Sequence, residues 1–420
     1  MTKKHKRKLN TKGIILFLII IIIIIALCIF FIVKPSKEQE EDNLMINLYN
    51  QELTKANELK EDYGLNLNIT YEYNDEIAKD HIISQSIKEG SKLKEGDTLD
   101  IVVSLGKLDK EKLASDNINE LGKVPIMMYH GIVNTEDNEY TGGNVDKDGY
   151  NRTAKAFRED LDFYYENGYR MVSLKDYING KIDTEYGKSP IVLTFDDGLE
   201  NNIKVTGLDD DGNIIIDENS AVGILESFKK EHPDMNVTAT FFVNGGMFNQ
   251  PEYNEKILKW LVANGYDVGN HTQNHLDIKT SSSDQVQKEI AYVYDELENY
   301  IPGGYVNIIP LPYGSPYVKT HENYQYVLNT TYNNKTYETI GALRVGWEPE
   351  VSPFNKDFDP TFLKRCRAYD NNGEEFDIEM VFNMLETTKY ISDGNENTIV
   401  TSEDNQDQVS SDLTQEIIYY

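Results

Sequence analysis

The amino-acid sequence begins with a long apolar stretch. Residues 13–33 carry no charged side chain, and as a helix they would span about 30 Å, the thickness of the hydrocarbon core of a bilayer. Lysines and an arginine lie within residues 1–12, whereas acidic residues follow from Glu38 onward. The positive-inside rule therefore predicts a cytoplasmic basic tail at 1–12, a single transmembrane helix at 13–33 and an extracellular chain over 35–420. A cleaved signal peptide is the alternative, although no small-residue cleavage site follows the stretch.

The pattern over residues 43–106 predicts a small α+β module. Apolar positions about one turn apart favour a helix over 51–62, which Tyr63-Gly64 would end. Residues of alternating character favour strands over 67–73 and 99–104, with a shorter run at 82–86 between them. Residues 107–122 are polar and charged, which is typical of a linker.

From residue 123 onward, short apolar runs alternate with amphipathic stretches. The expected strands are 124–130, 168–172, 191–195, 239–243 and 266–269, and the expected helices include 157–167 and 254–263. This alternation predicts an α/β domain over 123–393, with parallel strands around a common axis in a distorted (β/α) barrel. In such barrels the active site lies at the carboxyl ends of the strands.

Chemically useful side chains follow three of these strands. His130 ends the first run, Asp196-Asp197 follow the run at 191–195, and His271 follows the run at 266–269. His271 and His275 are four residues apart, so a helical turn would put both rings on one side. Two imidazoles and one carboxylate suit Zn²⁺ or a similar divalent ion. Each motif alone has a plain structural explanation, as a turn or an exposed helix face, but their coincidence at strand ends favours a metal-dependent hydrolase of amides such as N-acetyl groups.

Charge and cysteine content narrow the partners. The net charge is −30, and the basic cluster at the N-terminus leaves the rest of the chain still more acidic, which argues against nucleic acid as a partner. The acidity also has a plain explanation as a means of keeping a domain soluble. Cys28 lies in the apolar stretch and Cys366 lies far from it, so an internal disulfide is not expected.

Residues 124–390 resemble polysaccharide deacetylases, the NodB homology domain of carbohydrate esterase family 4. The matching motifs are Thr194-Phe195-Asp196-Asp197-Gly198, His271-Thr272-Gln273-Asn274-His275 and Leu311-Pro312-Tyr313-Gly314. The resemblance implies Asp196 as general base and Asp197, His271 and His275 as metal ligands. It also implies that the backbone N–H of Tyr313 stabilises the oxyanion, and that Pro312, Tyr313 and Trp347 contact the substrate. Trp347 has an alternative as an ordinary core aromatic.

Two departures from the family pattern concern the catalytic machinery. The third motif usually begins with arginine, and here Leu311 stands at that position. A Leu-x-His motif usually lies near the C-terminus, yet this chain has no histidine after His321. Met128-Tyr129-His130 has a similar form but precedes the first motif, as in a circularly permuted group of exopolysaccharide deacetylases. The expectation is that His130 is the general acid; a purely structural histidine is the alternative.

Residues 43–106 resemble a PASTA domain of wall-associated bacterial proteins, through Ile83-Ser84-Gln85-Ser86, Leu93-Lys94-Glu95-Gly96-Asp97 and Ile101-Val102-Val103-Ser104-Leu105-Gly106. That resemblance implies contact with peptidoglycan, although a single copy could act only as a spacer. Within the deacetylase-like region, residues 209–218 faintly resemble a calcium loop, but a β-hairpin is the better interpretation. The acidic residues 394–420 are expected to form a poorly ordered tail.

Together these features predict a membrane-anchored enzyme that removes acetyl groups from N-acetylglucosamine in peptidoglycan, on the wall side of a bacterial cell membrane. Two alternatives stay open. One is deacetylation of a secreted poly-N-acetylglucosamine, and the other is a catalytically weak wall-binding protein. The sequence leaves the metal, the deacetylated sugar and the oligomeric state undetermined.

Overall fold

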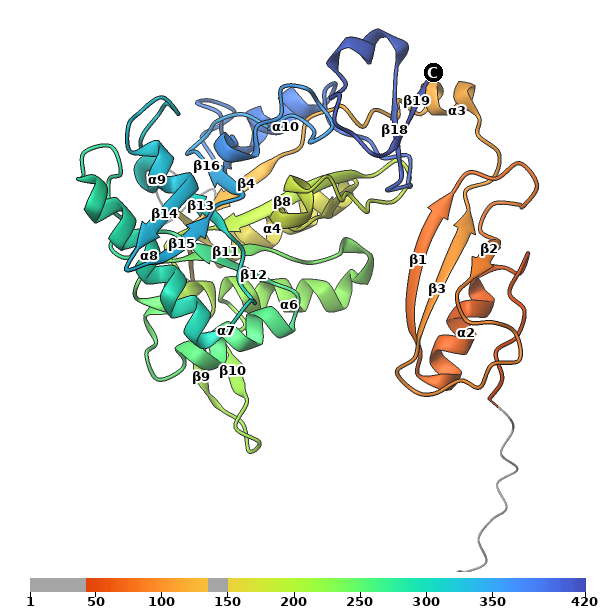
Figure 1. Ribbon diagram of the computed structural model, residues 1–420, viewed down its shortest axis with the longest axis horizontal. Helices are drawn as coiled ribbons and strands as arrows, with labels where there is room; N and C mark the ends of the chain where they lie inside the picture. Colours follow the sequence, from red (N-terminus) through yellow and green to blue (C-terminus); the bar gives the residue numbers. More distant parts are fainter. Residues whose placement is uncertain (1–42, 135–149) are drawn as a thin grey trace, which may run out of the picture. The chain divides into compact units, whose positions relative to one another are not determined.

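The structure is a computed structural model that describes residues 43–134 and 150–420 (Figure 1). These described residues divide into two compact units, one comprising those up to Ile69 with Asp80–Val103 and the other comprising Thr70–Lys79 with those from Ser104 to Tyr420. The predicted basic tail at 1–12 and transmembrane helix at 13–33 lie outside the described residues. In the two ranges that are described, no helix is long and apolar enough to cross a membrane.

The first unit packs one helix with a three-stranded sheet in the order β1-β3-β2. Its elements are α2 (Leu53–Tyr63), β1 (Asn66–Glu72), β2 (Ile82–Gln85) and β3 (Thr98–Ser104). Helix α2 ends where Gly64 takes a left-handed conformation with φ 64°, which glycine adopts without strain. Along β3, Leu99, Ile101 and Val103 are buried at every second position, so one face of the strand forms the core. The predicted α+β module is confirmed.

The second unit is built on a sheet of parallel strands (Figure 1). Within the described residues its six strands are β4 (Ile126–Tyr129), β7 (Tyr169–Met171), β8 (Ser189–Phe195), β11 (Thr240–Val243), β12 (Asp267–Asn270) and β17 (Cys366–Arg367). The order is β12-β11-β8-β4-β17, and β7 pairs with the start of β8. Every residue of β4 and β8 is buried, as expected for parallel strands that are covered on both faces.

Backbone hydrogen bonds continue from β12 back to β17. The Val306 N–H donates to the Val268 carbonyl, and β13 (Ile308–Pro310) pairs in parallel with β16 (Gly341–Leu343). The Leu363 N–H then donates to the Ala342 carbonyl, and the chain runs on directly into β17. The predicted α/β class with parallel strands is confirmed, and these links join both edges of the sheet through β13 and β16.

Amphipathic helices pack against the sheet. The longer ones are α4 (Ala154–Glu166), α6 (Ala221–Glu231), α7 (Asn254–Ala263), α8 (Ser283–Tyr300) and α10 (Ile378–Leu385). In α4, Phe157, Leu161 and Tyr164 are buried at helical spacing, and Thr153 caps the first turn by accepting a hydrogen bond from the Ala156 N–H. Shorter elements are α3 (Lys110–Ser115), α5 (Leu174–Ile178), α9 (Tyr324–Leu328), β5 (Gly131–Val133), β6 (Asn151–Thr153), β14 (Asn329–Tyr332) and β15 (Lys335–Glu338).

Three peripheral segments test the expectations from sequence. Strands β9 (Val205–Leu208) and β10 (Ile214–Ile216) form an antiparallel hairpin, so the preference for a hairpin over a calcium loop is confirmed. The expected linker at 107–122 instead contains α3 and buries Leu113 and Ile118. The expected acidic tail instead contains β18 (Thr398–Thr401), which is buried and pairs in parallel with β19 (Glu416–Tyr419). These last two segments pack on each other through a few apolar side chains, which their mostly polar sequences conceal.

Candidate active site

The functional side chains predicted from sequence gather at one edge of the parallel sheet. Asp196 and Asp197 directly follow β8, His130 directly follows β4, and His271 directly follows β12. The registers align these ends, because Tyr129 of β4 lies beside Phe195 of β8, and Val243 of β11 lies beside Asn270 of β12. Parallel strands therefore bring residues from three distant parts of the chain to the same place.

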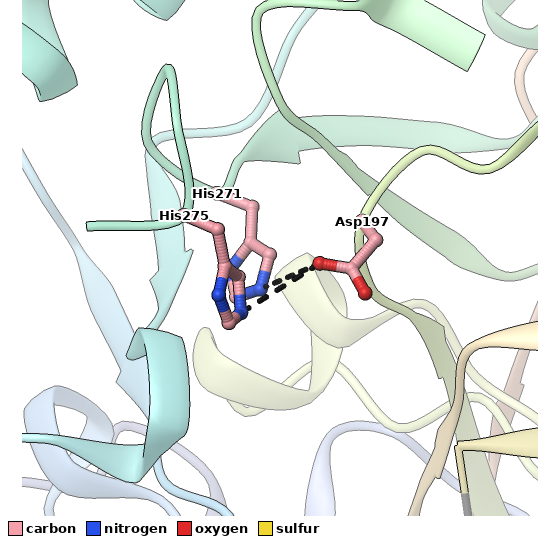
Figure 2. Close-up of side chains that lie close together, drawn as sticks. All are labelled: Asp197, His271 and His275. Atoms are coloured by element: carbon pink, nitrogen blue, oxygen red, sulfur yellow. Dashed lines mark ion pairs between the residues drawn. The ribbon is translucent and has the colours of Figure 1, made fainter. Parts of the chain in front are cut away.

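Asp197, His271 and His275 form one cluster, and Figure 2 shows both imidazole rings turned toward the carboxylate. Asp197 Oδ1 lies 3.5 Å from His271 Nε2 and 3.7 Å from His275 Nε2. One ligand atom from each residue lies within 4.8 Å of the other two. These three residues could hold a metal ion.

The two histidines reach this cluster from a loop. The residues from His271 to His275 are not helical, and both Thr272 (φ 63°) and His275 (φ 53°) have left-handed backbones. The Asn270 side chain accepts a hydrogen bond from the Thr272 N–H, and Thr272 Oγ1 accepts one from the Leu276 N–H. The predicted helical turn is therefore wrong, although the two rings meet with centroids 4.9 Å apart.

The chemistry of the cluster fits a divalent ion. His271 Nδ1 lies 3.0 Å from the Pro310 carbonyl oxygen, so this nitrogen carries the proton and Nε2 keeps its lone pair toward Asp197. Among the described residues, the buried Nε2 atom has no hydrogen-bond partner, which is unusual for such an atom unless a ligand satisfies it. Burial lowers the pKa of His271, although Asp196 and Asp197 oppose that shift, so the ring is neutral as metal binding requires.

Asp196 lines the same cavity and contacts a buried arginine. Arg365 Nη1 and Nη2 donate to the two carboxylate oxygens over 2.8 and 2.7 Å. Burial alone would raise the pKa of Asp196, but the charge of Arg365, with help from His271 and the Arg365 hydrogen bonds, holds that pKa well below its usual range. The backbone of Asp197 is left-handed, at φ 74°.

These groups line a cavity of about 290 Å³. Its wall comprises His130, Tyr150, Asn151, Asp196, Asp197, Leu199, His271, His275, Leu311, Tyr313 and Val345. His130 Nε2 lies 3.9 Å from Asp196 Oδ2, and the Tyr313 ring lies 4.4 Å from that of His275. Tyr313 itself has a left-handed backbone, at φ 58°.

Two residues that the family resemblance implied do not line this cavity. Pro312 is buried, and Trp347 is 46% exposed, with its ring 6.4 Å from that of Phe376. Leu311 and Val345 supply the apolar part of the wall instead. The sequence analysis also missed Arg365 and Tyr150, which touch the predicted Asp196 and His130 respectively. Lys364, Arg365 and Arg367 are three basic residues within a short stretch, so nothing in the local sequence singles out Arg365.

Comparison with known proteins agrees with the domain organisation. Residues 183–332 match a family model described as polysaccharide deacetylase, and residues 44–105 match the PASTA domain. The first match includes Asp196, Asp197 and both predicted metal-binding histidines, whereas His130 and Arg365 lie outside it.

Individual relatives cover part of the chain. A peptidoglycan-N-acetylmuramic acid deacetylase of Bacillus subtilis is 32% identical over 108 residues, 26% of this chain and 32% of the relative. A peptidoglycan-N-acetylglucosamine deacetylase of Bacillus cereus is 28% identical over 125 residues, 28% of this chain and 47% of the relative. The chain thus spans less than half of the length of these relatives.

Among solved structures, the Streptococcus pyogenes deacetylase PplD in complex with acetate is 20% identical, with a TM-score of 0.44 over 63% of this chain and 98% of that one. This likeness is too low to support a conclusion about activity. The two family models match separate parts of the chain that also fold as an α+β module and an α/β domain. The chain therefore carries a polysaccharide deacetylase domain and, before it in the sequence, a PASTA domain.

Proposed function

We propose that this protein removes N-acetyl groups from N-acetylglucosamine units of peptidoglycan, as a zinc-dependent hydrolase. The observation that carries the proposal is the cavity in which an Asp-His-His cluster, a second buried aspartate and His130 face one another. A hydrolase of amides needs an electrophilic centre, a base and an acid within reach of one bond, and these groups supply all three.

The ion would be held by Asp197, His271 and His275. When bound, a divalent ion polarises the amide carbonyl oxygen and activates water for attack. Nitrogen and oxygen ligands in this ratio suit zinc, and the hydrogen bond from His271 Nδ1 to the Pro310 carbonyl fixes the ring in the orientation that presents Nε2.

The other residues act on protons and charge. Asp196 is ionised because of Arg365, so it can accept a proton from the attacking water. His130, on the neighbouring strand end, would donate a proton to the departing amine. The backbone N–H of Tyr313 would stabilise the negative charge on the carbonyl oxygen, and the apolar side chains of Leu311 and Val345 would contact the acetyl methyl group.

The substrate and the location rest on the accompanying PASTA domain and on the relatives. A PASTA domain is typical of proteins that act at the bacterial cell wall. The two Bacillus relatives described above are named as peptidoglycan deacetylases. We place the activity outside the cell, with residues 13–33 as the membrane anchor. The position of His130 ahead of Asp196 in the chain favours a second candidate substrate, a secreted poly-N-acetylglucosamine.

The decisive assay measures acetate release by the purified full-length protein. Peptidoglycan and linear β-1,6-linked N-acetylglucosamine oligomers are compared, each with and without a chelator. We expect chelator-sensitive release from peptidoglycan, with mass spectrometry of the muropeptides locating the change on glucosamine rather than muramic acid. Release from the oligomers alone would favour the second candidate. No release from either glycan would favour the wall-binding alternative.

Two variants test the assigned roles. His275→Ala should lose bound metal and activity together, because a cluster of two ligands holds zinc weakly. His130→Ala should keep its metal but lose deacetylation by about 10²-fold or more, the usual contribution of a general acid. Wild-type rates in His130→Ala with full metal content would contradict the assignment of His130.

A further inference from the structure

Two loops leave the candidate active site together, one after β12 and the other after β13. Their first contact joins His275 to Tyr313, whose ring centroids lie 4.4 Å apart. Two residues further along both loops, Ser315 Oγ donates a hydrogen bond of 2.6 Å to Asp277 Oδ1. The same oxygen accepts a hydrogen bond from the Lys279 N–H over 3.0 Å. The loops are therefore joined where they leave the cavity, and that junction positions the backbone of Lys279.

The next contact between these loops pairs a cation with an exposed aromatic ring. The Lys279 ammonium lies 5.9 Å from the centre of the Tyr317 ring, close enough for attraction to the face of the ring. Tyr317 is 62% exposed, the highest value among the exposed large hydrophobic side chains of the described residues, and Tyr313 follows at 59%. Val318 is exposed beside them in the sequence. Apolar side chains that gather at the edge of a cavity are typical of a ligand-binding surface.

The charge of Lys279 stands out in a protein whose net charge is −30. Lys319, in the same loop as Tyr317, pairs with Asp359 over 2.5 Å. By contrast, within the two ranges that the structure describes, the Lys279 ammonium makes no ion pair and contacts the Tyr317 ring instead. The attraction between a cation and an exposed ring is weak, so the Lys279 ammonium is available to an anionic ligand.

The backbone that carries Lys279 is held by a buried side chain. Asn323 is 5% exposed, and its Nδ2 donates to the carbonyl oxygens of Ile278 and Ser281 over 2.7 and 2.8 Å. Ser281 Oγ donates in turn to the Asp277 carbonyl oxygen over 2.7 Å. A ligand that binds here therefore orders side chains rather than a loop, which keeps the entropic cost of binding low.

We propose that Tyr317 and Lys279 form a subsite for the peptide-bearing sugar next to the N-acetylglucosamine that is deacetylated. The Tyr317 ring stacks on the apolar face of the neighbouring muramic acid, and the Lys279 ammonium pairs with a carboxylate of its stem peptide. Neutral poly-N-acetylglucosamine offers the sugar face but no carboxylate. The proposal rests on the proposed function and deepens it, because it names the residues that select peptidoglycan over a neutral glycan.

The two side chains recognise different parts of the substrate, so their variants should differ. Lys279→Gln should raise KM for a peptide-bearing glycan by about twofold to fivefold, the usual contribution of an exposed ion pair, and leave KM for a neutral glycan unchanged. Lys279→Glu should raise the first KM by about tenfold or more, because like charges repel. Tyr317→Ala should raise KM for both glycans by about tenfold, whereas Tyr317→Phe, which keeps the ring, should not.

The test measures kcat, KM and bound metal for the full-length, metal-loaded protein. Its two soluble substrates are peptidoglycan fragments that retain their stem peptides and neutral β-1,4-linked N-acetylglucosamine oligomers of the same length. We expect kcat to stay within about twofold of wild type in all variants, since the subsite contributes binding that is equal in the ground and transition states. Lys319→Gln is the matched control, because it removes a nearby charge that is already paired with Asp359.

Salt provides a second measurement that a merely structural role would not change. Raising the ionic strength should raise KM for the peptide-bearing fragments in wild type, because ions screen an exposed pair, and should do so less in Lys279→Gln.

A loss that depends on the charge at position 279 and is confined to the peptide-bearing fragments supports the proposal. Equal KM values for these fragments in wild type and Lys279→Glu overturn it, as does an equal loss on both substrates or an unchanged KM in Tyr317→Ala. Equal KM values of the wild-type protein for the two substrates overturn the subsite and leave the deacetylase function standing. A wild-type protein that binds metal and releases acetate from neither substrate contradicts the proposed function instead.

Discussion

Asp196 and Glu120 are two buried carboxyl groups in the second unit, and their pKa values are shifted in opposite directions. Both are almost inaccessible, at 2% and 1% exposure. Asp196 pairs with the guanidinium of Arg365. Glu120 accepts hydrogen bonds from the Tyr390 hydroxyl and the Val400 N–H. The carboxyl group of Asp393 also interacts with Glu120. Unlike Arg365 beside Asp196, Asp393 raises the pKa of its neighbour.

The difference shows that burial does not by itself decide the charge of a carboxyl group. Burial of Glu120 raises its pKa well above the usual value, and the nearby Asp393 adds to that shift. The same burial acts on Asp196, but Arg365 outweighs it and lowers the pKa. The hydrogen bonds of Glu120 join the chain before β4 to β18, which suits a structural role, whereas the lowered pKa of Asp196 suits a chemical one.

The largest expected effect tests whether Asp196 takes part in the reaction. Asp196→Asn should reduce kcat for acetate release by about 10²-fold to 10⁴-fold, because an amide cannot accept the proton. Metal should remain bound through Asp197, His271 and His275, which elemental analysis of the purified variant would establish. Retained activity at full metal content would remove Asp196 from the reaction.

The second prediction concerns stability. Arg365→Met should lower the free energy of unfolding by about 3–5 kcal/mol, because the charge of Asp196 would stay buried without a partner. Urea denaturation at neutral pH measures the change, and the double variant Arg365→Met with Asp196→Asn should recover part of it. Equal stability of Arg365→Met and wild type would mean that water or another cation solvates Asp196.

The smallest effect appears in the pH dependence of stability. The pKa of Glu120 is raised above its usual value of 4.5 in the folded protein, so the folded state retains a proton that the unfolded state has released. Its stabilising contribution is complete below that value and is lost as the pH rises toward the folded-state pKa. Asp196, with a lowered pKa, behaves oppositely and loses its contribution only as the pH falls below 3.8.

Urea midpoints measured between about pH 5 and about pH 8 exclude the contribution of Asp196, which is constant over this range, and retain that of groups with raised pKa values such as Glu120 and Asp267. Glu120→Gln should make the midpoint depend less on pH, whatever its effect at a single pH. An unchanged slope in Glu120→Gln would assign the pH dependence to other groups, of which Asp393, also with a raised pKa, is the first to test.

Local sequence patterns were sufficient for the parts of the fold that depend on neighbouring residues. The apolar runs around Ile126 and Val192 predicted buried parallel strands, and the polar residues after them predicted the edge where the cavity lies. The segments 107–122 and 394–420 were misjudged because their few apolar residues, such as Ile118 and Val400, bury one another rather than forming a local pattern. The loop that carries His271 and His275 was misjudged because a spacing of four residues is compatible with more than a helix.

The sequence by itself determined that a strand end carries Asp196 and Asp197 and that two histidines four residues apart follow another strand, because these features are local. Only the tertiary structure decided which groups surround them. Arg365 lies 169 residues from Asp196, and Glu120 lies 280 residues from Val400, so no window along the chain could pair them. The pKa of a buried carboxyl group depends on such distant partners, and for that reason only the fold could show that the pKa of Asp196 is lowered and that of Glu120 is raised.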